Sequence, residues 1–488
     1  MRKKQYFITN DSTIDFTSEE EFSNYAIDEY TVFYHKDVES TLSRNENCTV
    51  AILGFIIDPY QPKASNQEIA NTLTSCTSKT DFFKSLEKLS GKYVVLYHTK
   101  EETILVTDCF AERQLYYWKN NDCYYISSSD KLILDSLSLQ PQIAPEKQAL
   151  LQDSLFLHIN EHWLLSEEDW DDRFKKLLPN HYLDILHHTV DRLPIFAPHQ
   201  LDKKTVALEV QMLLKNTIEA LTLRYDNILL PITAGYDSRL LLAASIDWKD
   251  HIAYYIFNTG RTYVRRDVKI AKRLAQIFTL NFKEIKVQEL SDAFKKKYAD
   301  HFIAARFLSK TRNIAWFDTH IKKPTINISG GGGYLRGVYD EASFTSTQEI
   351  CKAIEYDHLP IHEKAIQDWL VSVSAYAKEY NLDISDLFYH ELRMGKWASK
   401  MYHESDMTDV EYFSPLNNRH LIFSILRNIP TAQLHKPTSP FYRTLIKAML
   451  PKAATIPFNP KTWRDHIKSM IPYDRIKKQV RLLRYGKG

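Results

Sequence analysis

The hydrophobic positions of this chain follow two different spacings along its length. Over about the first 140 residues, β-branched and aromatic side chains dominate short runs, and polar clusters such as Lys119–Asp122 separate these runs. Two segments with helical spacing, Asn66–Leu73 and Asp81–Leu89, interrupt the series. The predicted strands are Thr31–His35, Val50–Ile57, Lys92–Tyr97, Thr103–Thr107, Leu115–Trp118 and Cys123–Ser127. This pattern predicts an α+β sandwich for the first part of the chain.

The second part of the chain alternates apolar strands with amphipathic helices. A helix is predicted over Lys203–Arg224, followed by a strand over Ile252–Phe257, a helix over Asp267–Phe278 and a strand over Phe282–Val287. The apolar positions of the first helix share one face: Val206, Val210, Leu213, Leu214, Ile218 and Leu221. This alternation predicts a doubly wound, parallel α/β sheet, in which ligands bind beyond the carboxyl ends of the strands.

A turn between the apolar run Ile228–Ile232 and the apolar run Leu240–Ala244 is the leading candidate for a ligand site. The turn consists of Thr233, Ala234, Gly235, Tyr236, Asp237 and Ser238. Backbone N–H groups at the start of a helix lack intrahelical partners, so they can converge with two hydroxyl groups on a phosphate. The pattern favours a site for a nucleotide pyrophosphate; an ordinary strand-to-helix connection made of small residues is the alternative.

A second glycine-rich segment follows another predicted strand, Pro324–Ile328. Its four consecutive glycines are Gly330, Gly331, Gly332 and Gly333. They permit positive φ and close backbone approach, so the loop can wrap an anion; a flexible surface turn is the alternative. Arg336 follows closely, and its guanidinium matches the geometry of a departing phosphate group. Asn258 and Thr259, after a predicted strand, are candidates to border adenine and ribose.

Composition narrows the class of protein. The 488 residues suffice for two or three domains, and 63 basic against 61 acidic residues give no bias toward nucleic acid or anionic membranes. We find no run of about eighteen apolar residues and no secretory signal, which predicts a cytoplasmic protein without a membrane partner. Five widely spaced cysteines without a Cys-x-x-Cys pair predict reduced, partly buried thiols: Cys48, Cys76, Cys109, Cys123 and Cys351.

The turn Thr233–Ser238 resembles the Ser-Gly-Gly-x-Asp-Ser pyrophosphate loop of the asparagine synthetase family. The two exchanges, Ser to Thr and Gly to Ala, retain a hydroxyl group and a small residue. The resemblance implies that a carboxylate attacks the α-phosphate of ATP, that pyrophosphate leaves, and that an amine converts the acyl-adenylate to an amide. It also implies that Asp237 coordinates Mg²⁺. With Arg336 binding the leaving group, Asp237 and Arg336 are the candidate catalytic residues.

Motifs in the first part of the chain resemble the glutaminase-like domain of the same family, which has an N-terminal-nucleophile (Ntn) fold. The matching segments are Leu89–Tyr93, Thr107–Asp108, Arg113–Tyr117 and Ile126–Lys131. Glutamine-hydrolysing members have a cysteine directly after the initiator methionine, where this chain has Arg2. Leu53–Asp58 lacks the polar residues of the family's glutamine-binding segment. We therefore expect a catalytically silent domain, as in the β-lactam synthetase branch.

The resemblance covers nearly the whole chain and gives a domain organisation. We expect an inactive Ntn-type domain over 1–175, a linker over 176–202, and a PP-loop (HUP-type) ATP-binding domain with C-terminal helices over 203–488. Within the predicted ATP-binding domain, a helix is predicted over Leu387–Tyr402. One face of this helix either lines a cleft or is solvated, and it consists of Arg393, Lys396, Trp397, Lys400 and Tyr402.

The chain departs from the family at positions that bear chemistry. In the second family signature, residues that help to hold Mg²⁺ are replaced by Gly331, Tyr334 and Leu335. Asp340 and Glu341 are close enough in sequence to substitute, although a solvated pair is the alternative. Ser439 stands where the family has a lysine that supports amide formation, and the candidates to replace it are Lys436 and Lys447.

These features favour an ATP-dependent amide ligase that takes its amine from solution. The carboxylate and amine substrates, small molecules or peptides, are not readable from the sequence, and a homodimer stays open. A degenerate pseudoenzyme that binds nucleotide or a partner is the second hypothesis, because acids and a lysine are missing. Glutamine-hydrolysing asparagine synthesis is the third, and Arg2 argues against it.

Overall fold

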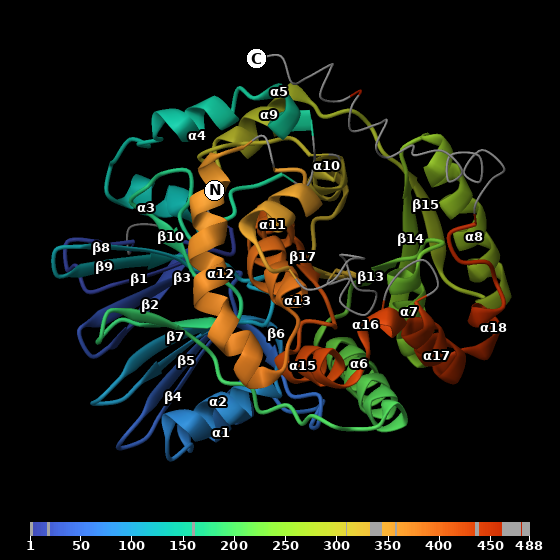
Figure 1. The fold of residues 1–488 in the computed structure, drawn as a ribbon, viewed down its shortest axis with the longest axis horizontal. Helices are drawn as coiled ribbons and strands as arrows, with labels where there is room; N and C mark the ends of the chain where they lie inside the picture. The colour runs from blue at the N-terminus through green and yellow to red at the C-terminus, as the bar shows by residue number, and fades with distance from the viewer. Residues whose placement is uncertain are drawn as a thin grey trace.

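The computed structural model describes residues 3–16, 20–158, 162–308, 310–331, 344–356, 359–434, 439–460 and 480. These residues contain two six-stranded antiparallel sheets and one five-stranded parallel sheet. In Figure 1 the antiparallel sheets lie on the left and the parallel sheet lies toward the right. The predicted mixed α/β architecture with several sheets is confirmed. All five cysteines are free thiols, as predicted, and three of them are buried. In the described part of the chain, no helix has the length and apolar character needed to cross a membrane.

The two antiparallel sheets pack face to face. The first sheet contains, in spatial order, β10 (Lys175–Lys176), β8 (Tyr116–Asn120), β9 (Cys123–Ser127), β1 (Tyr6–Thr9), β3 (Tyr30–His35) and β2 (Phe22–Ile27). The second contains β12 (Thr189–Arg192), β11 (His181–Asp184), β7 (Thr103–Thr107), β6 (Ser90–His98), β5 (Thr49–Ile57) and β4 (Ser40–Arg44). Their shared core includes Ile8 and Val32 from the first sheet and Leu53 and Val94 from the second.

Helices cover both outer faces of this pair of sheets. The helices α1 (Asn66–Thr74) and α2 (Lys79–Glu87) pack on the second sheet, and α3 (Asp130–Ser136) packs on the first. The result is a four-layer α/β/β/α sandwich, in agreement with the predicted α+β sandwich. Two short helices, α4 (Pro145–Leu150) and α5 (Ser154–His158), follow α3.

The sequence analysis missed six strands of the sandwich: β1, β2, β4, β10, β11 and β12. The strands β1, β2 and β4 lie in segments rich in polar residues, and β11 and β12 lie within 176–202, the segment predicted to be a linker. The segment predicted to be a linker thus contains a hairpin that pairs with β7. The three prolines close together did not indicate this hairpin, because backbone pairing leaves no compositional mark. The predicted division into domains stays a prediction.

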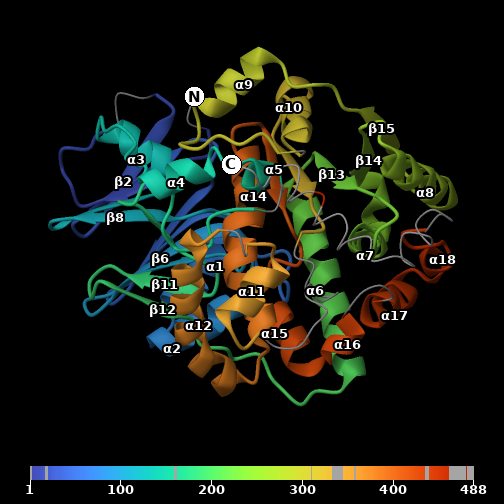
Figure 2. The ribbon, with the colours of Figure 1, turned by 45° about the horizontal axis from the view of Figure 1, so that its top comes forward.

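The parallel sheet has helices on both faces. Its order is β15 (Phe282–Lys286), β14 (Ile252–Asn258), β13 (Ile228–Pro231), β16 (Thr325–Ile328) and β17 (Val410–Phe413), with every neighbouring pair parallel. One face packs on α6 (Lys203–Arg224), α7 (Tyr236–Ser245), α8 (Thr262–Phe278), α15 (Arg419–Asn428) and α17 (Pro440–Met449). The other face packs on α10 (Thr311–His320) and α14 (Ser399–Ser405). Figure 2 shows α6 beside β13.

The described chain contains eight further helices. They are η1 (Ile246–His251), α9 (Asp292–Ala299), α11 (Thr347–Ala353), α12 (Ile361–Tyr380), α13 (Ile384–Phe388), η3 (Tyr389–Ala398), α16 (Thr431–Leu434) and α18 (Pro451–Ala454). The predicted helix Lys203–Arg224 has the bounds of α6. Asp202 caps its N-terminus by accepting from two backbone N–H groups, and all six predicted face positions are fully buried.

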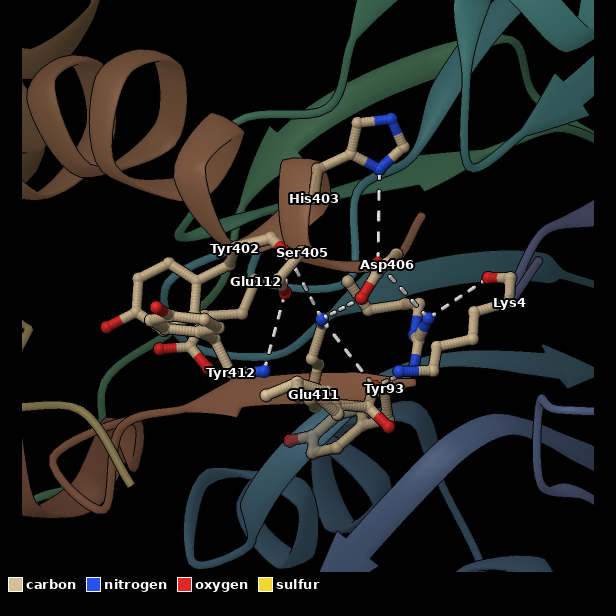
Figure 3. A network of polar contacts seen from close by, with 12 residues as sticks. Lys4, Tyr93, Glu112, Tyr402, His403, Ser405, Asp406, Glu411 and Tyr412 are labelled. Atoms are coloured by element: carbon tan, nitrogen blue, oxygen red, sulfur yellow. Dashed lines mark hydrogen bonds and ion pairs between the residues drawn. The ribbon is translucent and has the colours of Figure 1, made fainter. Parts of the chain in front are cut away.

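Buried ion pairs join the sandwich to the parallel sheet. Lys92 of β6 places Nζ 2.5 Å from Asp406 Oδ1 and 3.5 Å from Glu411 Oε1 of β17. Arg113 pairs with the same two carboxylates. Figure 3 shows Asp406 and Glu411 in this network, with Lys4 beside them. Burial opposes the charge of Glu411, but the nearby Arg113 and Lys92 hold its pKa well below the usual value. Because breaking such a buried pair is costly, the network fixes one sheet system against the other.

A second junction depends on pH. His420 of α15 lies with Nε2 2.9 Å from Glu209 of α6 and Nδ1 3.6 Å from Glu87 of α2. Burial opposes protonation of His420, but the bonds to the two carboxylates outweigh it and raise its pKa to about 9. The folded protein therefore retains a proton that an unfolded histidine loses near pH 6.5. This junction makes its full contribution to the free energy of unfolding below about pH 6.5, and the contribution is lost as the pH rises through about 9.

We expect His420→Gln to abolish this part of the pH dependence. The difference in free energy of unfolding between the wild type and H420Q should shrink from pH 6 to pH 9.5, measured by urea unfolding at each pH. A difference that stays constant over this range would contradict a charged His420 in the folded protein.

Candidate functional site

The turn Thr233–Ser238 lies where the order of the parallel strands reverses. The chain runs from β13 to β14 and β15 on one side, then returns to β16 and β17 on the other. The connections after β13 and β16 therefore diverge and leave a crevice at their carboxyl ends, where ligands bind in open α/β sheets. A Cβ on Gly330, after β16, would lie 2.8 Å from Cβ of Asp237 and 3.6 Å from the backbone N of Ser238. The two predicted segments thus meet at the edge where we expected them.

The hydroxyl groups of the turn converge. Oγ1 of Thr233 and Oγ of Ser238 are 2.8 Å apart, and the backbone N–H of Thr233 donates to Ser238 Oγ over 3.0 Å. The backbone N–H of Gly235 donates to Thr233 Oγ1 over 3.1 Å. Helix α7 begins directly after Gly235, and Ala234 and Tyr236 are buried beside it. The arrangement orders the turn and presents the start of a helix to the crevice.

Asp237 is held by a residue that the sequence analysis did not select. The hydroxyl of Tyr442, on α17, donates to Asp237 Oδ1 over 2.7 Å, and Tyr442 is fully buried. Ser439 lies one turn earlier in the chain at φ 37°, and its buried Oγ has no hydrogen-bond partner among the residues that the structure describes. Tyr442 lies three residues after Ser439, but nothing in the sequence marks it as a partner of Asp237.

Of the acids that the sequence analysis considered for Mg²⁺, Asp237 is the one that the structure describes, and a further carboxylate, Asp267 of α8, accepts from the backbone N–H of Ala234 over 3.4 Å. Among the described residues, no three His, Cys, Asp or Glu side chains gather into a metal site. Magnesium at nucleotide sites usually takes one or two carboxylates together with waters and phosphate oxygens. Asp237, between the turn and Gly330, fits this minimal role.

The segment Ile456–Pro460 packs on the turn. The backbone N–H of Asn459 donates to the carbonyl of Ala234 over 3.0 Å. The ring of Phe458 stacks on Tyr236 with centroids 4.4 Å apart and planes 7° apart. This segment was not predicted as part of the site.

A buried arginine fastens this segment. Arg239 of α7 is fully buried, donates to the carbonyl of Ile456 over 2.6 Å, and lies 4.0 Å over the ring of Phe458. Burial lowers its pKa to about 10, so it stays charged at neutral pH. Nothing in the apolar run around it in the sequence distinguishes this residue from a surface arginine.

The described part of the second loop packs against protein. A Cβ on Gly331 would lie 1.9 Å from the hydroxyl oxygen of Tyr402, and this hydroxyl donates to Ser329 Oγ over 3.2 Å. The hydroxyl of Ser414 donates to the carbonyl of Gly331 over 2.8 Å. Glycine is therefore required at Gly331 by close packing. Several predicted residues lie outside the described part of the chain: Arg2, Gly332, Gly333, Tyr334, Leu335, Arg336, Asp340, Glu341 and Lys436.

The two residues predicted to border the nucleoside follow β14. The Asn258 side chain donates to Glu284 over 2.6 Å and accepts from the N–H of Gly260 over 2.8 Å. Within the described ranges, the buried hydroxyl of Thr259 has no hydrogen-bond partner. Their contact with a nucleoside stays a prediction. Lys447 is exposed on α17.

Comparison with known proteins gives only weak similarities. No family model and no curated protein matches the chain. Among solved structures, the chain is similar to the allosteric regulatory enzyme of purine biosynthesis, with 12% identity over 72% of each chain and a TM-score of 0.26. It is also similar to glutamine phosphoribosylpyrophosphate amidotransferase from B. subtilis, complexed with ADP and GMP, with 11% identity over 73% of this chain and 84% of the other, and a TM-score of 0.24.

A third similar structure is glutamine-dependent NAD⁺ synthetase from Acinetobacter baumannii in complex with ADP. The identity is 10% over 49% of this chain and 58% of the synthetase, and the TM-score is 0.19. Because all three TM-scores are below 0.5, we infer neither fold nor function from these similarities.

Proposed function

We propose that the chain is an ATP-dependent, AMP-forming amide ligase of the asparagine synthetase type, which takes its amine from solution. The observation that supports it most is the meeting of the Thr233 and Ser238 hydroxyls, the start of α7 and Gly330 at the reversal point of the parallel sheet. This arrangement suits the triphosphate of a nucleotide.

In this proposal, the residues of the turn position ATP. The hydroxyls of Thr233 and Ser238 and the amides of Ala234, Gly235 and Tyr236 bind the pyrophosphate that leaves when a substrate carboxylate attacks the α-phosphate. Asp237 holds Mg²⁺, which when bound neutralises phosphate charge. Tyr442 fixes the orientation of Asp237. Arg336 and the four glycines Gly330, Gly331, Gly332 and Gly333 surround the departing anion, and Asn258 borders the nucleoside. Positioning and electrostatic stabilisation then supply most of the rate.

The sandwich supports the proposal that glutamine is not hydrolysed. Phe55, Ile56 and Ile57, at positions where the family binds glutamine, are almost completely buried and paired with β6. Apolar side chains in a core cannot contact a polar substrate. We propose that this Ntn-type domain is architectural.

Exchange of radioactive pyrophosphate into ATP tests the adenylation step. Formation of an acyl-adenylate is reversible, so the wild-type protein with Mg²⁺ and a panel of amino acids, peptides and sugar acids should show exchange with one class of acid. Chelation of Mg²⁺ should stop it. Absence of exchange with every acid, together with absence of ATP binding by calorimetry, would exclude the ligase.

A pseudoenzyme is the second candidate. The packing of Phe458 and Asn459 on the turn favours it, because side chains that cover the turn restrict access of a nucleotide. ATP binding without exchange would support a nucleotide-binding protein that lacks catalysis.

A further inference from the structure

An exposed basic surface lies on a different helix from the one that the sequence analysis considered. The face predicted over Leu387–Tyr402 is not solvated, because Lys396 of η3 and Lys400 of α14 are only 1% and 8% exposed. Helix α8 instead presents exposed cations along one side, and the edge strand β15 adds another. We call these five residues the basic face: Arg265, Lys269, Lys272, Arg273 and Lys286.

The basic face is continuous across α8 and β15. The four cations of α8 fall within about 100° of its circumference and extend over about 12 Å of its axis. The opposite side of α8, with Val268 and Leu274, is buried against the parallel sheet. In β15, Glu284 lies with Oε2 2.5 Å from Nζ of Lys272, and Lys286, two residues later, shares that side of the strand. Figures 1 and 2 show α8 and β15 at the edge of the molecule away from the sandwich.

Positive charge is concentrated in this region. Residues 261–286 contain eight basic and two acidic residues, whereas the whole chain has a net charge of +2. Both acids are engaged within the protein: Asp267 accepts from a backbone N–H of the turn Thr233–Ser238, and Glu284 pairs with Lys272. Within the described ranges, the other four cations of the basic face form no ion pair. The balanced total charge of the chain therefore conceals a strongly positive surface.

The spacing of these cations is unfavourable for the protein alone. Lys269 lies four residues from both Arg265 and Arg273, so like charges are neighbours on the helix surface and repel each other. By contrast, exposed Lys364 of α12 has the acid Asp368 four residues later. A polyanion bound to the basic face would replace this repulsion by attraction.

The chemistry of the basic face favours a phosphate backbone as the partner. The residues of the face are all Lys or Arg, which bind phosphates, and none is aromatic or apolar. The face itself therefore offers neither a stacking platform for single-stranded bases nor the apolar centre of a protein interface. The apolar side chains of α8 lie in the core, so they are not available for insertion into a membrane.

The arrangement of the cations favours RNA over DNA. Side chains that diverge over about 100° of a helix can contact two rows of phosphates that lie close together. The narrow major groove of an A-form RNA duplex provides such rows, and its bases are out of reach of side chains. The major groove of B-DNA is about 12 Å wide and admits a whole helix, whose side chains then read base edges.

We propose that the basic face binds the phosphate backbone of double-stranded RNA without sequence preference. The binding is independent of the proposed ligase reaction, because none of its five residues belongs to the proposed nucleotide site.

Fluorescence anisotropy of a labelled RNA duplex of about 16 base pairs tests the proposal. With the full chain, without ATP and at about 50 mM salt, we expect saturable binding with a Kd on the order of 10 µM or tighter. About four phosphate contacts should make the Kd rise about 10²-fold between 50 and 200 mM salt. Absence of binding at the lower salt concentration would overturn the proposal.

Lys269→Glu tests the location of the site. Glutamate at this central position lies four residues from Arg265 and Arg273, so it should stabilise α8 and the variant should fold. K269E should bind the duplex at least about tenfold more weakly and reduce the salt dependence by about two phosphate contacts. The matched control is Lys296→Glu, the same change of charge at an exposed position of α9, which should keep wild-type binding.

Lys286→Gln provides a test on a different element. It should weaken binding by a smaller factor and reduce the salt dependence by about one contact, so the site stays testable even if K269E does not fold. Wild-type binding by K269E with a wild-type unfolding temperature, or by K286Q, would contradict the site.

Competition identifies the class of partner. An unlabelled DNA duplex of the same length, a single-stranded RNA and vesicles that contain phosphatidylserine should each displace the labelled duplex less effectively than unlabelled RNA duplex does. Equal or stronger competition by any of the three would overturn the assignment to double-stranded RNA.

Discussion

Glu391→Ala is expected to lower the free energy of unfolding by about 3–5 kcal/mol, because it leaves a buried cation without its partner. Glu391 of η3 is fully buried and accepts from Arg192 Nε at 2.9 Å and Nη2 at 2.8 Å, from Asn180 at 2.8 Å and from the indole of Trp369 at 2.7 Å. One carboxylate thus joins the sandwich strand β12 to the helices α12 and η3. Urea unfolding followed by circular dichroism measures the loss.

The control for this variant is Glu363→Ala, on an exposed position in the first turn of α12, which should change stability by only about 0.5 kcal/mol.

The dependence of stability on acid pH provides an independent check of the role of Glu391. Burial opposes the charge of Glu391, but the charges of His181 and Arg192 and the hydrogen bonds from Arg192 and Asn180 outweigh it and lower its pKa to about 2. A lowered carboxyl pKa stabilises fully above about pH 4.5. This contribution should disappear as the pH falls toward 2, and E391A should lack that part of the acid dependence.

Asp237→Asn is expected to reduce pyrophosphate exchange about 10²- to 10³-fold if the proposed ligase is correct. The amide oxygen of asparagine can still accept from Tyr442, so the variant removes the charge while the bond that orients the residue is retained. The effect should appear in kcat, with an altered dependence on Mg²⁺ concentration.

Two further variants separate charge from position. Tyr442→Phe keeps the carboxylate and removes its anchor, so it should reduce exchange less, by about tenfold, and Mg²⁺ dependence should stay close to that of the wild type. Asp247 of η1 forms a surface ion pair with Lys215 of α6, and Asp247→Asn should leave exchange unchanged. Equal activity of D237N and the wild type would remove Asp237 from the proposed mechanism.

The elements predicted with most success have strong periodicity. The bounds of α6 match the prediction because six apolar residues at helical spacing mark one buried face, and an aspartate caps its start. The strands β5, β6 and β7 are nearly continuous runs of β-branched and aromatic residues. By contrast, β2 (Phe22–Ile27) mixes polar with apolar residues and buries only Ile27, and its strand conformation comes from pairing with β3.

The residues of the candidate site also differ in whether the sequence could identify them. The turn Thr233–Ser238 could be identified from sequence because a phosphate site requires small residues and hydroxyls within one short stretch. Tyr442, Arg239 and Phe458 could not, because each is separated from the turn by other elements or lies in an apolar context that gives no signal.

The sequence by itself determined the types of most elements, the alternation that builds a parallel sheet, and the location of the phosphate-type turn, since all three depend on residues close together in the chain. Only the tertiary structure decided that 181–192 is a hairpin of the second sheet, that the lysines of η3 and α14 are buried, and which side chains hold Asp237 and Glu391. These features depend on contacts between residues far apart in sequence. Their energies arise from packing and desolvation, which no local pattern records.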